Sequence, residues 1–247
     1  MIKGIYSSGA GMQPHSARLE VLANNIANAN TTGFKKDKLF IQAMKDAGVA
    51  HSQGEGELKG LESRAFIDFS EGSFMETKNP LDFAIQGRGF FVLETPQGIR
   101  YTRNGNFSMA ADGTVINGQG YPVLGSSGKI QVPQPQKISE TSISVNGHGD
   151  ISLGSVHLGK LRVADFENLN LIKKAGNSMF VTDAQEKPVN LDGHDTIVRQ
   201  GYLEESNVEG IHEMIELVEM TRSFETDQRT IQSQDSTLER AMDIGRV

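Results

Sequence analysis

An unbroken stretch near the C-terminus constrains the fold more than any other feature of the sequence. Between Ile211 and Asp243 there is neither proline nor glycine, so the segment from about Val208 to Asp243 is predicted to form one helix. About 36 residues would span about 54 Å. Helices in globular proteins average about 11–12 residues, so a helix of this length is expected to need a partner.

Apolar side chains recur every seven residues along this helix, as they do in helices that pack against another helix. They are Leu217, Phe224, Ile231 and Leu238. The row between them consists of Met214, Thr221, Gln228, Asp235 and Met242. Polar positions in a seam fix the register of a helix pair at some cost in stability. The pattern therefore predicts a partner helix, and the alternative is an exposed helix on a globular domain.

A second, shorter helix is predicted near the N-terminus, from about Gln13 to Asn28. Its seven-residue row consists of Ile5, Met12, Leu19 and Ile26, with Leu22 and Ala23 in the row between. Pro14 is expected in the first turn, where its missing N–H would have no partner in any case. A narrow helix of this length is marginal in isolation, so it too is expected to pack against another helix.

The end of the N-terminal helix is rich in asparagine, with four in the seven residues 24–30. Asparagine bonds to nearby backbone and tolerates left-handed geometry, so it suits a helix end. Thr32 and Gly33 then supply a turn, and Phe34 is expected to anchor it. An ordinary helix cap requires fewer asparagines than this.

The two ends of the chain carry opposite charge. Residues 1–40 hold five basic and two acidic side chains, whereas residues 203–247 hold four arginines and eleven acidic side chains. Two solvated helix faces would account for this pattern. The alternative is that the ends lie against each other, or against the ends of neighbouring copies.

Short apolar runs separated by turns fill the middle of the chain. Residues 89–102 and 106–116 each read as a hairpin, and the glycine-rich residues 48–62 read as a flexible connector. Strands that recur every 8–12 residues are typical of a sandwich or irregular barrel. The predicted fold class is α+β, with a helical domain of residues 1–63 and 203–247 and a β-rich domain of residues 64–202.

The composition argues against several function classes. The chain of 247 residues has no cysteine, which excludes thiolate metal sites and cysteine nucleophiles. Its six histidines are scattered and no loop matches a nucleotide-binding pattern. A net charge of −7 disfavours nucleic acid. We therefore expect no enzyme, cofactor, metal or nucleic-acid partner.

Membrane insertion and a cleaved signal peptide are not expected either. There is no apolar run of about 18 residues, and the first residues are too polar and rich in glycine for a secretion signal. The chain is thus expected to stay in the cytoplasm, or to be exported without cleavage.

Four segments resemble the bacterial flagellar rod and hook proteins, in family order. They are residues 23–35 (ANNIANANTTGFK), residues 79–92 (NPLDFAIQGRGFFV), residues 101–107 (YTRNGNF) with Gly120–Gly125, and residues 200–208 (QGYLEESNV) with Arg222–Glu225. Four motifs in order are strongly specific, whereas residues 126–200 match only in their β character.

This resemblance implies a structural subunit of the flagellar basal-body rod. The terminal helices would pair as a coiled coil around the export channel and order on assembly, and the β domain would lie outside. Partners would be copies of the chain, other rod and hook proteins and the flagellar type III export apparatus. The location would be the periplasmic rod, reached without signal cleavage. A proximal rod protein is favoured over a distal one, because the connector lacks a longer glycine-rich stretch; a phage-tail or adhesin-like binding protein is a further alternative.

The residues expected to carry assembly lie in the asparagine-rich turn and in the two seven-residue rows. They are Leu19, Leu22, Asn24, Asn25, Ile26, Asn28, Thr32, Gly33, Phe34, Met214, Leu217, Phe224, Ile231 and Leu238.

Overall fold

The computed structural model describes residues 2–43, 61–133, 143–182, 188–190 and 196–244. These residues form two compact units. The helical unit comprises the described residues of 1–27, 37–68 and 208–247, and the β unit comprises those of 28–36 and 69–207. The sequence boundaries at 63 and 203 differ from this division, because residues 28–36 and 203–207 belong to the β unit and residues 64–68 to the helical unit.

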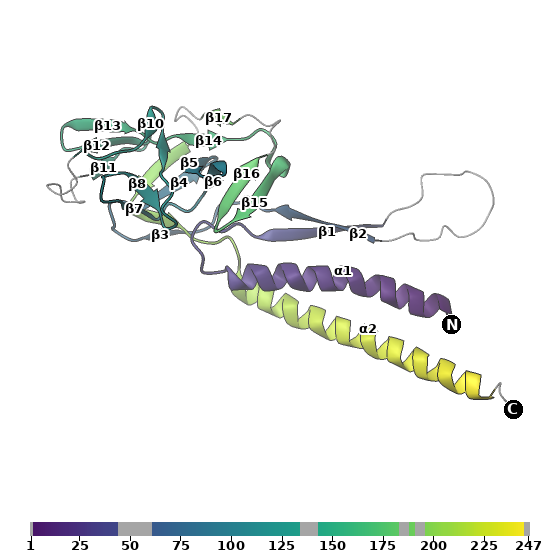
Figure 1. The fold of residues 1–247 in the computed structure, drawn as a ribbon. Helices are drawn as coiled ribbons and strands as arrows, with labels where there is room; N and C mark the ends of the chain where they lie inside the picture. The colour runs from purple at the N-terminus through teal and green to yellow at the C-terminus, as the bar shows by residue number, and fades with distance from the viewer. Residues whose placement is uncertain (1, 44–60, 134–142, 183–187, 191–195, 245–247) are drawn as a thin grey trace. The chain divides into compact units, whose positions relative to one another are not determined.

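The helical unit contains two long helices and a hairpin (Figure 1). Its elements are α1 (Ile2–Ala27), β1 (Asp37–Ala43), β2 (Leu61–Ile67) and α2 (Gly210–Ile244). Helices α1 and α2 lie side by side and antiparallel, with both chain ends at the same end of the pair. No helix in the described ranges is both long and apolar enough to cross a membrane.

The predicted helices exist, but the N-terminal one is longer than expected. Helix α1 starts at Ile2 rather than near Gln13, so Pro14 lies inside it and not in its first turn. A proline there removes the backbone hydrogen bond to the residue four positions earlier. The sequence signal was weak because residues 4–11 contain three glycines and two serines, which are poor helix formers.

The hairpin β1–β2 was not expected from the sequence. Its strands pair antiparallel from Asp37 opposite Ile67 to Ala43 opposite Leu61. The predicted connector of residues 48–62 lies outside the described residues except at its end, where Leu61 and Glu62 begin β2. Strands separated by so long a segment carry no local turn signal, which is why the pairing was missed.

The β unit is built from short strands. They are β3 (Phe74–Glu76), β4 (Phe83–Gly87), β5 (Phe90–Thr95), β6 (Gly98–Thr102), β7 (Phe107–Met109), β8 (Val115–Asn117), β9 (Leu124–Gly125), β10 (Gly128–Lys129), β11 (Ile143–Val145), β12 (Asp150–Leu153), β13 (Val156–Lys160), β14 (Val163–Asp165), β15 (Ile172–Gly176), β16 (Met179–Thr182), β17 (Val189–Asn190), β18 (Thr196–Gln200) and β19 (Tyr202–Glu204), with a 3-10 turn at Leu169–Leu171. The predicted hairpins are confirmed as β5–β6 and β7–β8.

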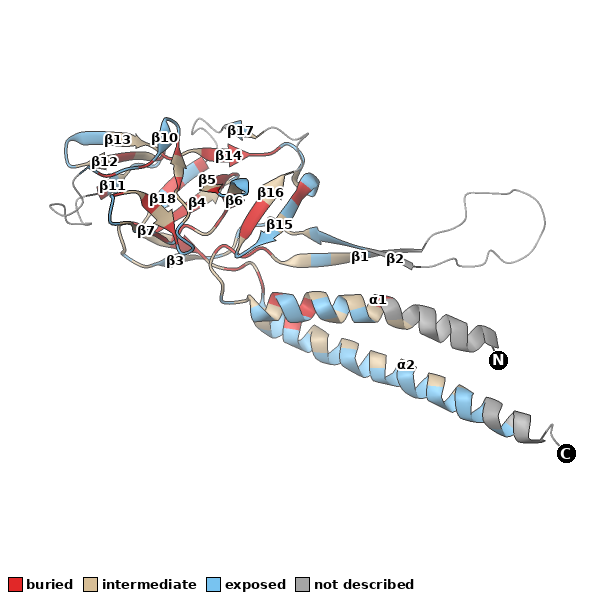
Figure 2. Ribbon diagram, in the orientation of Figure 1, coloured by how far each residue is buried: buried red, intermediate tan, exposed pale blue. Residues whose placement is uncertain are grey.

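One six-stranded sheet, in the order β15-β16-β6-β5-β14-β17, organises the β unit, and smaller sheets surround it. Strand β5 is buried on both faces (Figure 2). Phe91 and Leu93 belong to the main apolar cluster, whereas the Phe90 ring contacts Phe180 and Phe166. Since successive side chains of a strand point to opposite faces, β5 lies between two apolar layers. The described chain is thus α+β, with a mostly β central region and one helix at each end.

Candidate assembly site

The asparagine-rich segment forms a tight turn directly after α1. The carbonyl of Asn28 accepts the Thr31 N–H at 3.1 Å, and the carbonyl of Thr31 accepts the Phe34 N–H at 3.2 Å. The Thr32 hydroxyl lies 3.0 Å from Asn104 Oδ1. The Phe34 side chain is buried, with Lys174 Nζ 4.1 Å from its ring centre. The turn and its aromatic anchor are therefore part of the β unit.

Gly33 is required by the backbone geometry of this turn. Its φ is +65°, and a Cβ at this position would lie 2.3 Å from the backbone nitrogen of Asn104. Its N–H donates to the carbonyl of Glu204 at 2.8 Å. Only a residue without a side chain allows the turn to approach Asn104 and β19 this closely.

Gly33→Ala is expected to lower the free energy of unfolding of the β unit by more than about 2 kcal/mol, because left-handed strain adds to a backbone clash. Urea unfolding followed by tyrosine fluorescence measures this. Gly118→Ala is the matched control, since a Cβ there meets nothing within 4 Å. Equal stability of the two variants would contradict the required glycine.

Three charged side chains are buried together behind the turn. Lys35, Arg103 and Glu204 are 0%, 4% and 1% exposed. Lys35 Nζ lies 2.5 Å from Glu204 Oε1, and Arg103 Nη1 lies 3.2 Å from Glu204 Oε2. Burial lowers the pKa of Lys35, and the Glu204 carboxylate opposes this shift. One carboxylate therefore pairs with two buried cationic side chains, and we call this set the Glu204 cluster.

Backbone groups complete the Glu204 cluster. Lys35 Nζ donates to the Ser70 carbonyl at 2.6 Å, and the Gly72 N–H donates to Glu204 Oε1 at 3.2 Å. The guanidinium of Arg103 donates to the carbonyl of Gly87 at 2.8 Å. The cluster thus joins the segment that follows α1 to β19, the last strand before α2.

A second polar junction lies in the helical unit, around Asn25, which is 1% exposed. Asn25 Nδ2 donates to the carbonyl of Asp37 at 2.9 Å, and the Asp37 N–H donates to Asn25 Oδ1 at 2.9 Å. Asn25 Nδ2 also donates to Glu213 Oε2 at 3.1 Å. One amide therefore connects α1, β1 and the first turn of α2.

Asn25→Asp is expected to destabilise the helical unit by about 2–4 kcal/mol, because a carboxylate cannot donate to Asp37 and repels the buried Glu213. Amide hydrogen exchange along α1 measures the loss. Adding Glu213→Gln removes the repulsion and should restore part of the protection. A single variant with unchanged protection in α1 would contradict the role of Asn25.

Farther from this junction, α1 and α2 contact each other through polar side chains. His15 Nδ1 lies 3.0 Å from Met220 Sδ, and His15 Nε2 lies 3.6 Å from Asp227 Oδ2. Arg18 Nε donates to Glu216 Oε1 at 3.0 Å. Residue numbers rise along α1 while those of their partners fall along α2, as antiparallel pairing requires.

Apart from Glu216, the covered side chains of α2 form one row with steps of three and four residues, which we call the α2 seam. It consists of Glu213, Leu217, Met220, Phe224, Asp227, Ile231 and Gln234, all buried or half-buried. The expected row that contains Leu217, Phe224 and Ile231 therefore lies in the seam. The second expected row began at Met214, which is 53% exposed. In its place the seam contains a row that starts at Glu213. The side chain of Leu238 lies outside the described residues.

The other predicted residues are distributed over both units. Leu22 is 4% exposed, Leu19, Ile26 and Asn28 are half-buried, and Asn24 is exposed. Sequence reasoning missed the Glu204 cluster and Glu213. A signal for the cluster was present, because Lys35, Arg103 and Glu204 each lie in one of the resemblance motifs, but nothing in the sequence showed that they meet.

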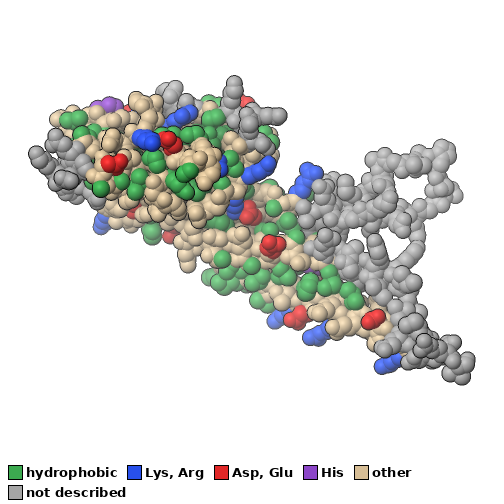
Figure 3. All heavy atoms as spheres, in the orientation of Figure 1, with side chains coloured by type: hydrophobic (Ala, Val, Ile, Leu, Met, Phe, Trp, Pro, Cys, Tyr) green, Lys and Arg blue, Asp and Glu red, His purple; other side chains and the backbone are tan. Residues whose placement is uncertain are grey.

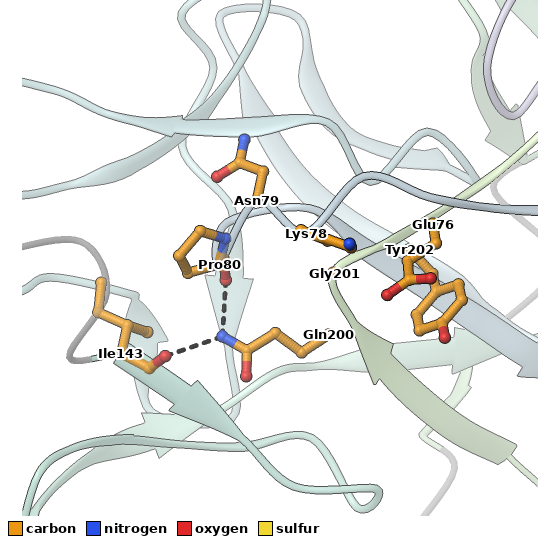
Figure 4. Close-up of a pocket in the computed structure, with 8 residues that line it drawn as sticks. All are labelled: Glu76, Lys78, Asn79, Pro80, Ile143, Gln200, Gly201 and Tyr202. Atoms are coloured by element: carbon orange, nitrogen blue, oxygen red, sulfur yellow. Dashed lines mark hydrogen bonds between the residues drawn. The ribbon is translucent and has the colours of Figure 1, made fainter.

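The β unit also contains a pocket of about 290 Å³, lined by Glu76, Lys78, Asn79, Pro80, Ile143, Gln200, Gly201 and Tyr202 (Figure 4). Gln200 Nε2 donates to the carbonyls of Pro80 and Ile143 at 2.7 and 2.8 Å. Its Oε1 accepts the Val145 N–H at 3.0 Å. The Gln200 amide therefore links the backbone of residues 80, 143 and 145 within the β unit. Among the described residues, no three histidine or acidic side chains are grouped so that they could hold a metal.

The described chain thus has a helical unit in which the two terminal helices pair, and a β unit with a buried charged cluster of its own. Three family models match along the chain. They are "Flagella basal body rod protein" at residues 5–35, "Flagellar hook protein FlgE/F/G D1 domain" at residues 84–153, and "Flagellar basal body rod FlgEFG protein C-terminal" at residues 199–244.

Relatives match over nearly the whole chain. The sequence is 32% identical to flagellar basal-body rod protein FlgF of Rhizobium meliloti over 98% of both chains, and 29% identical to FlgG of Bacillus subtilis over 100% of both. It is 31% identical to FlgF of Caulobacter vibrioides over 84% of this chain and 83% of that protein. The chain belongs to the flagellar basal-body rod protein family, and it is a structural subunit of the rod.

Proposed function

We propose that this chain forms the proximal segment of the flagellar rod and assembles helically through α1 and α2 around the export channel. The observation that supports this most strongly is the α2 seam, together with the long exposed surface on the rest of α2. A pair of helices that leaves one helix mostly exposed is incomplete as a fold. Neighbouring copies would cover that surface, with the pair forming a coiled coil in the assembled rod.

The residues proposed to carry assembly divide into three roles. Leu22, Asn25, Leu217, Phe224 and Ile231 hold the two helices together within one chain. Side chains that stay exposed on the helices, such as Met214, are available to a neighbouring subunit, and Asn24 lies at an exposed position of α1 as well. Gly33 and Phe34 fix the turn that leads out of α1.

Alignment lengths support the proximal assignment. The match to FlgF of Rhizobium meliloti extends over 246 positions, whereas the match to FlgG of Bacillus subtilis extends over 270 positions for this chain of 247 residues. The alignment with the FlgG relative therefore includes positions that are absent from this chain, whereas the alignment with the FlgF relative includes hardly any. This agrees with the short connector on which the proximal assignment rests.

The chain is further proposed to reach the periplasmic rod unfolded, through the flagellar type III export apparatus and without signal cleavage. Position and copy number in purified basal bodies test the assignment. A few copies near the membrane-ring end would support the proximal rod. About two dozen copies in the shaft beneath the hook would overturn it in favour of the distal rod.

A further inference from the structure

The chain passes between the helical unit and the β unit at four places. These crossings lie between residues 27 and 28, 36 and 37, 68 and 69, and 207 and 208. Helix α1 ends at the first crossing, the hairpin β1–β2 lies between the second and the third, and α2 begins shortly after the fourth. A residue of the β unit that binds several of these segments at once would bring together the points from which the helices and the hairpin start.

Asn207, the last residue of the β unit before α2, binds the backbone beside three crossings. Its Oδ1 accepts the Lys36 N–H at 2.8 Å. Its Nδ2 donates to the Ser70 carbonyl at 3.2 Å and to the Ser70 hydroxyl at 3.1 Å, and its own N–H donates to the Phe34 carbonyl at 3.4 Å. We call Phe34, Lys36, Ser70 and Asn207 the Asn207 hub.

The remaining crossing, directly after α1, is tied to the Asn207 hub by the asparagine-rich turn. The carbonyl of Asn28 accepts the Thr31 N–H, and the carbonyl of Thr31 accepts the Phe34 N–H. The Ser70 carbonyl also accepts a hydrogen bond from Lys35 Nζ at 2.6 Å, so the hub is continuous with the Glu204 cluster. All four crossings therefore leave the β unit close to one connected set of hydrogen bonds.

Only an amide side chain can make the contacts of Asn207. The Lys36 N–H requires an acceptor and the Ser70 carbonyl requires a donor, and a carboxylate offers no donor. Asn146 makes three hydrogen bonds as well, but all of them go to His148 and Asp150 within its own turn. The partners of Asn207 are instead 171 and 137 positions away in the sequence. Asn207 thus joins distant segments, whereas Asn146 closes a local turn.

The two helices need help to find each other. Hydrophobic side chains remain at the surface of the helical unit (Figure 3), and Ile211 and Ile215 on α2 are 79% and 55% exposed. The pair therefore leaves apolar surface uncovered, and helices that lack tertiary packing are marginal in water. Residues 28–209 separate the end of α1 from the start of α2, and closing a flexible loop costs more entropy as its length grows. Holding the crossings together removes much of that entropic cost.

We propose that Asn207 is a positioning residue for α1 and α2. Through the Asn207 hub, the folded β unit holds together the chain segments from which the helices start, and this makes their pairing a short-range event. The inference rests on the proposed function and deepens it, because it names the residue that prepares the helix pair for assembly. It also sets an order, in which the β unit folds first and the helices pair afterwards.

An internal cross-link between the helices tests the proposal in the isolated full-length chain. The chain contains no cysteine, so Arg18→Cys and Glu216→Cys introduce a single pair of thiols at positions whose side chains contact each other across α1 and α2. Dilute protein is treated with a short bismaleimide, and the yield of internal cross-link reports the effective concentration of the two thiols. Adding Asn207→Ala is expected to lower this yield by about tenfold, because the crossings are no longer held together.

Asn146→Ala in the same cysteine background is the matched control. It also removes three hydrogen bonds of an asparagine in the β unit, but it should leave the cross-link yield within about twofold of the parent. Asn207→Asp keeps the acceptor for Lys36 and loses the donor to Ser70, so its yield should lie between those of Asn207→Ala and the parent.

A second measurement separates positioning from general stability. Three of the four tyrosines lie in the β unit, so urea unfolding followed by tyrosine fluorescence reports on that unit. The midpoint of Asn207→Ala should equal that of Asn146→Ala. A much lower midpoint for both Asn207 variants, with the cross-link lost in proportion, would mean that Asn207 supports the whole β unit and would overturn the positioning role.

Two cross-linking results would also overturn the proposal. One is an unchanged yield in Asn207→Ala, and the other is an equal loss of yield in Asn207→Ala and Asn146→Ala. Both are measured on the isolated chain, so either result would leave the rod function intact. Absence of the unaltered chain from purified basal bodies would instead overturn the proposed function, whatever the cross-link yields are.

Discussion

Glu204→Gln is expected to lower the free energy of unfolding of the β unit by about 3–5 kcal/mol, the usual cost of removing one partner from a buried ion pair. The substitution keeps the size of the side chain but removes its charge. Lys35 and Arg103, at 0% and 4% exposure, would then remain buried without the carboxylate that pairs with both of them. Urea unfolding followed by tyrosine fluorescence measures the loss, since the chain has four tyrosines and no tryptophan.

Glu205→Gln provides the matched control for this prediction. Its carboxylate bonds to the Ser73 hydroxyl at an exposed position, so its loss should cost less than about 1 kcal/mol. Adding Lys35→Met to Glu204→Gln removes one uncompensated cation and should recover part of the stability. If the Glu204 and Glu205 variants were equally stable, the Glu204 cluster would not hold the β unit together.

Phe224→Asp is expected to abolish swimming while export of the chain continues. Phe224 lies in the α2 seam, and a carboxylate there costs a few kcal/mol when the helices pair and are covered in the rod. The β unit does not include this residue, so its stability should not change. Motility in soft agar and the amount of chain in basal bodies measure the effect.

Ser223→Asp places the same charge at the neighbouring exposed position. It should leave swimming and the level of the chain in basal bodies near normal, because it lies outside the seam. Normal swimming by the Phe224→Asp strain would count against the α2 seam as the element that pairs the helices.

Local patterns in the sequence determined the elements that depend on neighbouring residues. Helix α2 was predicted from a stretch without glycine or proline. The seven-residue row predicted that Leu217, Phe224 and Ile231 lie in its seam, because helical side chains three and four residues apart share a face. The hairpins β5–β6 and β7–β8 followed from apolar runs on either side of short turns. The four motifs placed the chain among the rod proteins, and the matches of family and relatives confirm this.

Only the tertiary structure decided which distant residues meet. Lys35, Arg103 and Glu204 are far apart in the chain, and a charged residue looks the same in sequence whether it is solvated or buried with a partner. The hairpin β1–β2 and the choice of Glu213 rather than Met214 for the seam also depend on what packs against each helix. Periodicity is a local property, so the sequence alone predicted the helices and hairpins. Burial and long-range pairing depend on the whole fold, so only the structure showed which of these elements contact one another.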